Sequence, residues 1–174
     1  MLKTAAPGIT HKSDATGVVL GLGTLDAVAG AYEDLSARLG PRVLVQEMVA
    51  GPAVEMILGM VRDEDFGPIL VIGSGGIHAE VLADVVYAKP PIGPATARRL
   101  VDRLKLRALL GGVRGRPPAD MAALCETIAR FSVLAASLGT AVGSIDVNPL
   151  LVRDSGCIAV DALVVPASQD ALAG

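Results

Sequence analysis

The sequence predicts an α+β fold in which helices flank a largely antiparallel sheet. Segments of strand length, rich in Val, Ile and Leu, follow one another in clusters, whereas a doubly wound fold would alternate strands and helices regularly. Hydrophobic residues make up 52% of the chain and aromatic residues only 2%, so the core must be aliphatic. With 174 residues, the chain is long enough to bury about 70% of its extended surface on folding.

The first fifty residues indicate short strands around one helix. Apolar runs predict strands at residues 2–6 and 17–22. A helix is expected from the N-cap Thr24 to Gly40, because apolar residues recur at helical spacing until a Gly-Pro pair ends the pattern. A further strand is predicted at residues 42–49.

The middle of the chain predicts an antiparallel meander. Residues 54–63 have the pattern of a strand. Residues 67–82 predict two strands joined through a run of glycines. Residues 84–92 predict a further strand, which the two prolines near its end terminate. Connections this short favour strands that are neighbours in the sheet.

Helices and a hairpin are predicted for the last part of the chain. Apolar periodicity indicates helices at residues 95–110 and 119–138, separated by the breaker GGVRGRPPAD, whose Asp120 is a candidate N-cap. Residues 143–152 and 157–165 have the pattern of two strands joined by a tight turn.

Charge and cysteine content exclude several classes of function. There are 15 Lys and Arg against 18 Asp and Glu, so no basic field exists to hold a nucleic acid. The two cysteines have no CxxC spacing, which predicts neither a disulfide framework nor a structural zinc. Neither a signal-peptide pattern nor an apolar run of about 18 residues occurs. We therefore expect a cytoplasmic protein without nucleic-acid or membrane partners.

The closing hairpin contains the sharpest candidate site. If residues 154–155 form a two-residue turn, Asn148 lies directly across from Asp161, with Cβ atoms about 5 Å apart. Asp146 then points to the same side, and oxygen ligands of this kind suit Mg²⁺. A three-residue turn would instead send Asn148 to the other face. Ordinary polar residues at strand ends are the competing interpretation.

The loop HKSD is a second candidate. His11 has a neutral ring nitrogen near pH 7 and can act as a nucleophile. Lys12 can offset phosphate charge, and Asp14 can orient the imidazole ring. A solvated loop histidine is the alternative interpretation.

Three further features suit a phosphate or a nucleotide. Gly75 and Gly76 permit close backbone approach to a phosphate, although a tight strand connection also needs them. Arg114 lies in a loop bracketed by glycines, where it can grip a phosphate or a carboxylate, or simply face solvent. Glu47 and Glu55 flank a turn, where they can accept hydrogen bonds from adenine or ribose, or lie on the surface.

Together these motifs occur in an order that resembles the ATP-grasp domain of the NDP-forming acyl-CoA synthetases, relatives of the succinyl-CoA synthetase β subunit. The similarity runs nearly end to end. The segments that carry it are LKTAAPGITHKSDATGVVLGL, VLVQEMVAGPAVEMILGMVRDEDFGPILVIGSGGIHAEVL, LLGGVRGRPPAD, and IDVNPLLV followed by IAVDALV. Each segment alone is unspecific, whereas the ordered series indicates one family.

The resemblance implies roles for individual residues. Lys3 matches a lysine that contacts nucleotide phosphates, and His11 matches a loop histidine that carries a phosphoryl group in some ADP-forming members. Asn148 and Asp161 match the metal-binding pair, in agreement with the register argument. The hinge beside the adenine and the acidic residue near the ribose correspond to Glu47, Met48, Val49 and Glu55.

The resemblance also implies a reaction, cofactors and partners. Mg²⁺ and ATP or ADP are the implied cofactors of an acid–CoA ligase that interconverts acyl-CoA, ADP and phosphate with acid, ATP and CoA. A CoA-binding subunit or domain is the implied partner. A non-catalytic nucleotide-binding or assembly module on the same fold is the alternative function.

Relative to that family, we expect residues 1–174 to form a partial ATP-grasp domain that is incomplete at the N-terminus and needs the missing N-terminal segment. Residues 1–50 would be the remainder of the N-terminal subdomain, and residues 51–174 the C-terminal subdomain. The strand at residues 2–6 would then lack neighbours and expose an edge, which favours either self-association into homo-oligomers or marginal order of this strand.

Overall fold

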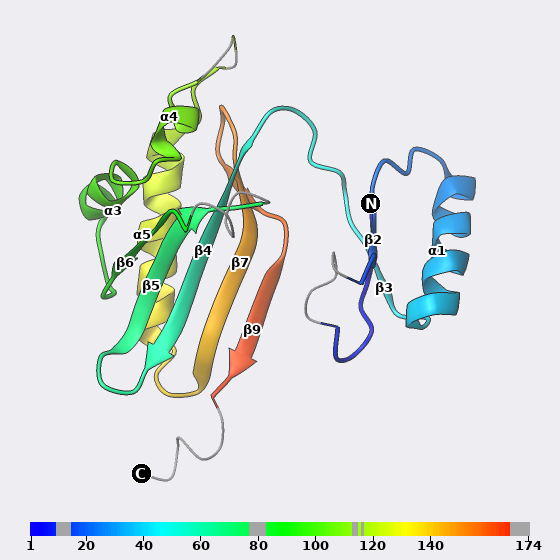
Figure 1. The fold of residues 1–174 in the computed structure, drawn as a ribbon, viewed down its shortest axis with the longest axis horizontal. Coiled ribbons are helices and arrows are strands. Elements are labelled where there is room, and N and C mark those ends of the chain that lie inside the picture. Colours follow the sequence, from blue (N-terminus) through cyan, green and yellow to red (C-terminus); the bar gives the residue numbers. More distant parts are fainter. Residues whose placement is uncertain (10–14, 77–82, 113–114, 116, 168–174) are drawn as a thin grey trace. The chain divides into compact units, whose positions relative to one another are not determined.

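Two compact units make up the chain, Met1–Ala50 and Gly51–Gly174 (Figure 1). Both combine strands with helices, which confirms the predicted α+β class. The correspondence of these units to the two subdomains of an ATP-grasp domain stays a prediction. The computed structural model describes residues 1–9, 15–76, 83–112, 115 and 117–167.

The first unit is a three-stranded antiparallel sheet with one helix. Its strand order is β2-β1-β3, so that β1 has a neighbour on each side. The strands are shorter than the predicted ranges 2–6, 17–22 and 42–49. The elements are β1 (Leu2–Thr4), β2 (Val18–Val19), α1 (Leu25–Leu39) and β3 (Val43–Val45).

The position of β1 corrects the expectation of an exposed edge. β1 is the central strand of its sheet, and Leu2, Lys3 and Thr4 are all buried. The neighbours that seemed to be missing come from within the unit, because β2 and β3 fold back on either side of β1. β1 therefore exposes no sheet edge, and homo-oligomerisation stays a prediction.

Helix α1 begins and ends where the sequence predicts. The Thr24 hydroxyl accepts a hydrogen bond from the Ala27 N–H at 3.2 Å, which caps the first turn. Gly40 follows the last turn with a φ of 96°, a conformation that favours glycine. Within α1, Leu35 is the buried residue and holds the helix against its unit.

A six-stranded antiparallel sheet forms the body of the second unit (Figure 1). Its order is β6-β5-β4-β7-β8, and β9 pairs with β7 beyond the end of β8. β4, β5 and β6 form the predicted meander. The strands are β4 (Val54–Asp63), β5 (Gly67–Ser74), β6 (Val85–Ala88), β7 (Val142–Val152), β8 (Cys157–Ala159) and β9 (Ala162–Pro166).

Two predicted strands differ from the observed ones. The single strand predicted at residues 157–165 is split, because residues 160–161 interrupt the strand between β8 and β9. β5 ends at Ser74, and the predicted continuation at residues 77–82 lies outside the described residues.

Helices cover one face of this sheet (Figure 1). They are α3 (Pro94–Val101), α4 (Arg107–Leu110) and α5 (Met121–Ser137). In the part of the chain that the structure describes, no helix has the length and apolar character needed to cross a bilayer.

The single helix predicted at residues 95–110 is wrong. α3 ends at Val101, and a series of turns leads to α4. The N–H groups of Lys105 and Leu106, which a continuous helix would use internally, donate to the carboxylate of Asp84 instead. The Asp84 carboxylate therefore interrupts the helix at residues 105–106, although the apolar residues of 95–110 recur at helical spacing.

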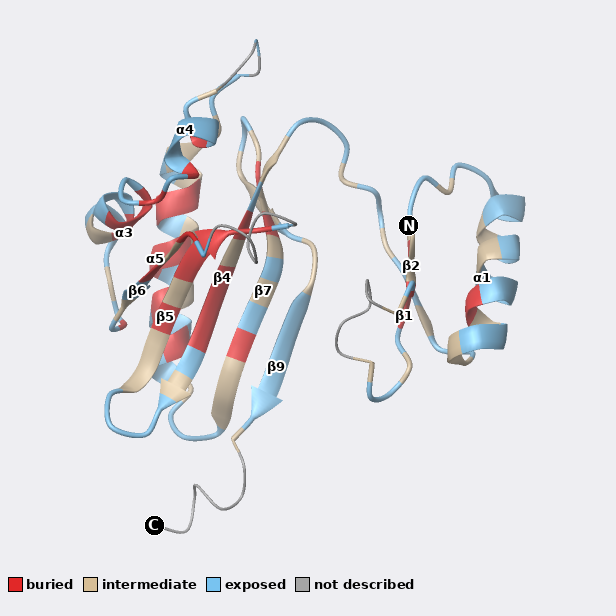
Figure 2. Cartoon of the chain, viewed as in Figure 1, coloured by how far each residue is buried: buried red, intermediate tan, exposed pale blue. Residues whose placement is uncertain are grey.

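The core of the second unit lies between the helices and the sheet. Met56, Leu58 and Met60 on β4 are each at most 2% exposed and face the helices. Figure 2 shows that burial is concentrated on β4, β5 and α5, whereas β9 is exposed along its length. Cys125 is buried in this core and Cys157 packs against it, both as free thiols, in line with the prediction of no disulfide.

Candidate functional site

The hairpin formed by β7 with β8 and β9 has the predicted register. Arg153 donates its N–H to the Gly156 carbonyl at 3.0 Å, so residues 154–155 are the turn. The register continues unchanged from β8 into β9, where Val147 pairs with Ala162. The alternative register, from a three-residue turn, is excluded.

Asn148 and Asp161 lie opposite each other, which confirms the register argument. The Asn148 N–H donates to the Asp161 carbonyl oxygen at 3.2 Å. The adjacent Val147 packs against the core on the side of the helices. Because side chains alternate along strands, Asn148 and Asp161 project from the face that the helices leave open. Asn148 is exposed and Asp161 half-buried, so a ligand from solvent can reach both.

A β-bulge in β7 lies at this position. The register between β4 and β7 shifts between two cross-strand pairs, Leu58–Val147 and Met56–Leu150. β4 has one residue between these pairs, whereas β7 has two, residues 148–149. The extra residue allows the apolar side chains on both sides of the bulge to face the helices while the polar residue between them faces away.

Asp146 adds a second carboxylate to the open face, because it lies two positions before Asn148. It pairs with Gly59 on β4 and with Leu163 on β9. Carboxylate and amide oxygens are the hard donors that Mg²⁺ prefers. Among the described residues, no three His, Cys, Asp or Glu side chains lie close enough together to hold a metal. A cation here would therefore need the amide of Asn148 and several oxygens from outside the protein.

Asp120 fixes the turn of this hairpin as well as the start of α5. One carboxylate oxygen accepts the Ala123 N–H at 3.0 Å, which is the predicted N-cap contact, and the other accepts the Gly156 N–H at 3.0 Å. The Asp120 N–H also donates to the Arg153 carbonyl at 2.7 Å. The N–H groups of Ala123 and Gly156 hold the pKa of Asp120 below its ordinary value. The hydrogen bond from Gly156 to Asp120 could not be predicted from the sequence, because the two residues are far apart along the chain.

Asp84 is a buried carboxylate that the sequence reasoning missed. It is 7% exposed and accepts hydrogen bonds from the Ser74 hydroxyl at 2.9 Å and from the N–H groups of Lys105 at 2.9 Å and Leu106 at 2.8 Å. Burial raises the pKa of Asp84, but the three donors outweigh burial, so its pKa lies below its ordinary value. Asp84 therefore ties the end of β5 to the turn before α4.

The glycines after β5 pack against the start of β4. The Gly75 N–H donates to the Glu55 carbonyl at 2.9 Å, and a Cβ on Gly75 would lie 2.9 Å from backbone atoms of Glu55 and Met56. Gly76 has a φ of 65°, and a Cβ there would collide with the Glu55 carboxylate. Close packing against the start of β4 thus accounts for both glycines, and their contact with a phosphate stays a prediction.

The candidate nucleotide contacts in the first unit lie on β1 and after β3. Lys3 is 4% exposed and has a strand on each side. Glu47 and Met48 are exposed, and Val49 is half-buried, in the segment that follows β3. Glu55, the candidate ribose contact, belongs to the second unit and is exposed. The nucleotide roles of all five residues stay predictions.

The remaining candidates lie outside the described residues. These are the loop histidine His11 with Lys12 and Asp14, and the loop arginine Arg114.

Comparison with known proteins places the chain in a family. A model described as an ATP-grasp domain matches residues 1–165. The ADP-forming acetate–CoA ligase I of Archaeoglobus fulgidus is 39% identical over 172 residues, which are 95% of this chain and 25% of that ligase. The β subunit of the ADP-forming acetate–CoA ligase I of Pyrococcus furiosus is 32% identical over 95% of this chain and 74% of the subunit. The chain thus spans about a quarter of the single-chain relative.

Solved structures agree with the predicted fold. The dinucleotide-forming acetyl-coenzyme A synthetase 1 of Ca. Korarchaeum cryptofilum, in complex with coenzyme A and Mg-AMPPCP, superimposes with a TM-score of 0.83 at 30% identity. The match covers 95% of this chain and 76% of that chain. With a family model that extends over nearly every residue and a fold that agrees with it, the chain belongs to the ATP-grasp family and is homologous to part of the ADP-forming acyl-CoA ligases.

Proposed function

We propose that the chain forms the nucleotide-binding part of an ADP-forming acid–CoA ligase, in which Asn148 and Asp161 bind Mg²⁺ together with ATP or ADP. The proposal rests on this opposed pair, found on the open face of a sheet in a chain that the ATP-grasp model matches over residues 1–165. When bound, Mg²⁺ would offset negative charge on the nucleotide phosphates. The solved relative described above contains Mg-AMPPCP, which supports the choice of cation and ligand.

The remaining nucleotide contacts are proposed from their matches to the family. Lys3 would neutralise a phosphate, and its burial in the centre of a sheet restricts its orientation. Residues 47–49 would lie beside the adenine, and Glu55 would accept hydrogen bonds from the ribose hydroxyls. On this proposal, residues 1–50 belong to the N-terminal subdomain of the ATP-grasp domain and residues 51–174 form the C-terminal subdomain.

His11 is proposed as the carrier of the phosphoryl group. The phosphoryl group would pass from a phosphohistidine of the CoA-binding partner to a His11 ring nitrogen, with one P–N bond broken and another formed. It would then pass from His11 to a terminal phosphate oxygen of ADP, which breaks a P–N bond and forms the P–O bond of ATP. Two short in-line transfers replace one long one. The solved relative carries a phosphohistidine segment that points towards its nucleotide site, which supports such a relay.

A CoA-binding subunit or domain completes the proposed reaction, in which acyl-CoA, ADP and phosphate are interconverted with acid, ATP and CoA. The Pyrococcus furiosus relative is a β subunit, and the Archaeoglobus fulgidus relative is a single chain about four times the matched length. Both observations support a division of the activity between this ATP-grasp part and other parts.

Calorimetry with ADP and ATP, in the presence and absence of Mg²⁺, tests the metal pair. Asp161→Ala should weaken Mg²⁺-dependent binding about tenfold or more, because it removes a charged ligand. Asp154→Ala is the matched control, since it removes a carboxylate from the turn of the same hairpin and should leave affinity unchanged. Without Mg²⁺, the wild type and Asp161→Ala should bind nucleotide equally weakly.

Two results would contradict the proposal. Equal Mg²⁺-dependent affinity in the wild type and Asp161→Ala would remove the metal role. Absence of nucleotide binding under every condition would leave the assembly module as the function.

The relay needs a separate experiment with a CoA-binding partner subunit present. Radiolabelled ATP should leave an acid-labile, base-stable label on the chain, and His11→Ala should lose that label while keeping nucleotide affinity. A label that persists in His11→Ala would exclude the proposed carrier.

A further inference from the structure

A cluster of basic side chains covers the surface of α3, α4 and the turns between them. Residues 98–107 contain five cationic side chains and a single carboxylate, in a chain whose acidic residues outnumber its basic ones. The apolar residues of the same segment, such as Leu100 and Leu104, are buried, so the cationic side chains all face solvent. The basic cluster consists of Arg98, Arg99, Arg103, Lys105 and Arg107.

Asp102 holds two of these arginines side by side. One of its carboxylate oxygens accepts a hydrogen bond from the Arg98 Nε at 3.0 Å, and the other accepts one from the Arg107 Nε at 2.9 Å. A single negative charge therefore balances two positive charges only in part. The terminal NH₂ groups of both guanidinium groups form no hydrogen bond with the described residues, which leaves donors for further carboxylates.

An apolar pocket of about 370 Å³ adjoins these two arginines. It lies between α3, α4 and the start of α5, and both Arg98 and Arg107 line it. A group that enters the pocket meets an aliphatic wall and positive charge together. The pocket therefore suits an apolar side chain that has carboxylates beside it. The rest of the wall is formed mainly by Leu110, Pro118, Ala119 and Met121.

The turn between β4 and β5 has the complementary features. It consists of residues 64–66, which are all exposed, and the Phe66 side chain is 64% exposed. The Asp63 carboxylate accepts the N–H groups of Asp65 at 3.0 Å and Phe66 at 2.9 Å, which holds the turn in one shape. The carboxylates of Glu64 and Asp65 form no ion pair with the described residues. The turn thus presents two carboxylates and an aromatic ring on a pre-formed backbone.

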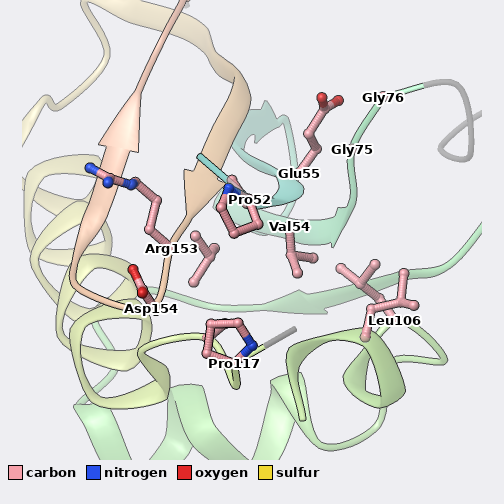
Figure 3. A pocket seen from close by; sticks show the side chains of 13 residues that line it. Pro52, Val54, Glu55, Gly75, Gly76, Leu106, Pro117, Arg153 and Asp154 are labelled. Atoms are coloured by element: carbon pink, nitrogen blue, oxygen red, sulfur yellow. The ribbon is translucent and has the colours of Figure 1, made fainter. Parts of the chain in front are cut away.

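A single copy cannot bring this turn to its own basic cluster. α4 lies beside the start of β4, where Leu106 and Val54 line one cavity (Figure 3). The turn follows the other end of β4, a strand of ten residues that extends over roughly 30 Å. Both features belong to the second unit and lie at opposite ends of its sheet (Figure 1). Only another copy of the chain can therefore join them.

We propose that the turn of one copy docks against the basic cluster of a second copy. Phe66 enters the apolar pocket, and the two carboxylates that precede it pair with the guanidinium groups of Arg98 and Arg107. Because each copy has one turn and one cluster at opposite ends, the contact is head-to-tail and can continue beyond a dimer. It requires neither nucleotide nor metal, so it goes beyond the proposed ligase function.

Static light scattering on the 174-residue chain, from about 10 µM to about 500 µM, tests the association. A contact made by one turn in one pocket is small, so it should be weak and the average mass should rise steadily with concentration. At about 0.5 M NaCl the mass should return towards that of the monomer, because salt screens exposed ion pairs.

Two double variants separate the halves of the contact. The cluster variant is Arg98→Gln with Arg107→Gln, and the turn variant is Glu64→Gln with Asp65→Asn. Each variant alone should stay monomeric, because it lacks one half of the contact. An equimolar mixture of the two should form dimers with one copy of each and nothing larger, because each variant keeps the half that the other lacks.

Matched controls remove charge elsewhere on the second unit. Arg130→Gln on α5 and Asp154→Asn in the turn after β7 each neutralise one exposed residue, and both should associate like the wild type. Phe66→Ser should weaken the association about tenfold, because the ring would no longer be buried in the pocket. Its exposure in the single copy means that this change leaves the core intact.

Four outcomes would overturn the proposal. The first is a monomer at every concentration in low salt. The second is association that the cluster variant or the turn variant retains, and the third is a monomeric mixture of the two variants when both have native circular dichroism. The fourth is a chain that stays monomeric but binds inorganic phosphate through Arg98 and Arg107, which would make the cluster a site for small anions instead.

Discussion

Replacement of Asp84 by alanine should destabilise the second unit strongly. The carboxylate accepts three hydrogen bonds, from the Ser74 hydroxyl and from the N–H groups of Lys105 and Leu106. Ser74 is 1% exposed and Leu106 is 7% exposed, so neither donor can easily turn to water when the carboxylate is removed. Lys105 is exposed, and its N–H can be hydrated.

The magnitude follows from the two donors that would be left buried. Each unsatisfied buried polar group costs about 1–3 kcal/mol, so Asp84→Ala should lower the free energy of unfolding by about 2–6 kcal/mol. Asp84→Asn should cost less, because the amide oxygen still accepts one of the bonds. A domain is typically stable by only about 5–15 kcal/mol, so the alanine variant is expected to lie close to unfolding.

Urea unfolding followed by tyrosine emission measures this effect in the correct unit. The chain has two tyrosines and no tryptophan, with Tyr32 on α1 in the first unit and Tyr87 on β6 in the second. In a Tyr32→Phe background, the remaining emission reports the second unit alone. Asp102→Asn is the control, because this carboxylate pairs with exposed arginines on the surface and such pairs contribute little.

The pH dependence provides an independent check on the charge of Asp84. Because its pKa is depressed in the folded state, the stability that the carboxylate contributes is present above its unfolded pKa and is lost as pH falls through the folded pKa. Between about pH 5 and about pH 3, the free energy of unfolding should therefore fall less steeply in Asp84→Asn than in the wild type. An identical slope, or an alanine variant within about 0.5 kcal/mol of the wild type, would refute the reasoning.

Three further substitutions test other parts of the structure. Asp120→Ala should lower the melting temperature and speed amide exchange at Gly156, because it removes the acceptor that holds the hairpin turn to α5; unchanged exchange would argue against that link. Gly75→Ala should lower the melting temperature because its Cβ would collide with the backbone of β4, whereas Gly30→Ala, where a Cβ meets open space, should be neutral or stabilising. Leu35→Ala should cost about 2–5 kcal/mol and should appear in Tyr32 emission but leave Tyr87 emission unchanged.

Features set by neighbouring residues were predictable from the sequence. Thr24 and Asp120 cap their helices as expected, because an N-cap depends on a side chain and N–H groups only a few residues away. The register that opposes Asn148 and Asp161 follows from a two-residue turn and was also predictable, since the turn fixes every later pair.

Features that depend on distant residues were not predictable. The break between α3 and α4 requires the carboxylate of Asp84, about twenty residues earlier in the chain. The central place of β1 depends on the return of β3 from beyond a complete helix. The bulge at residues 148–149 can be recognised only from the pairing of β7 with β4. The sequence of β7 alone does not reveal that β4 has one residue fewer between the same two pairs.

The bulge at residues 148–149 also determines which changes of chain length this protein can tolerate. Removal of one residue there would let β7 pair with β4 without a bulge, but it would leave residues 160–161 opposite a single residue of β7, so that the opposition of Asn148 and Asp161 would be lost. The same loss from the turn after β4 would shorten an exposed loop. The extra residue of β7 is thus matched by the two residues between β8 and β9, so the length of that connection and the bulge can only change together.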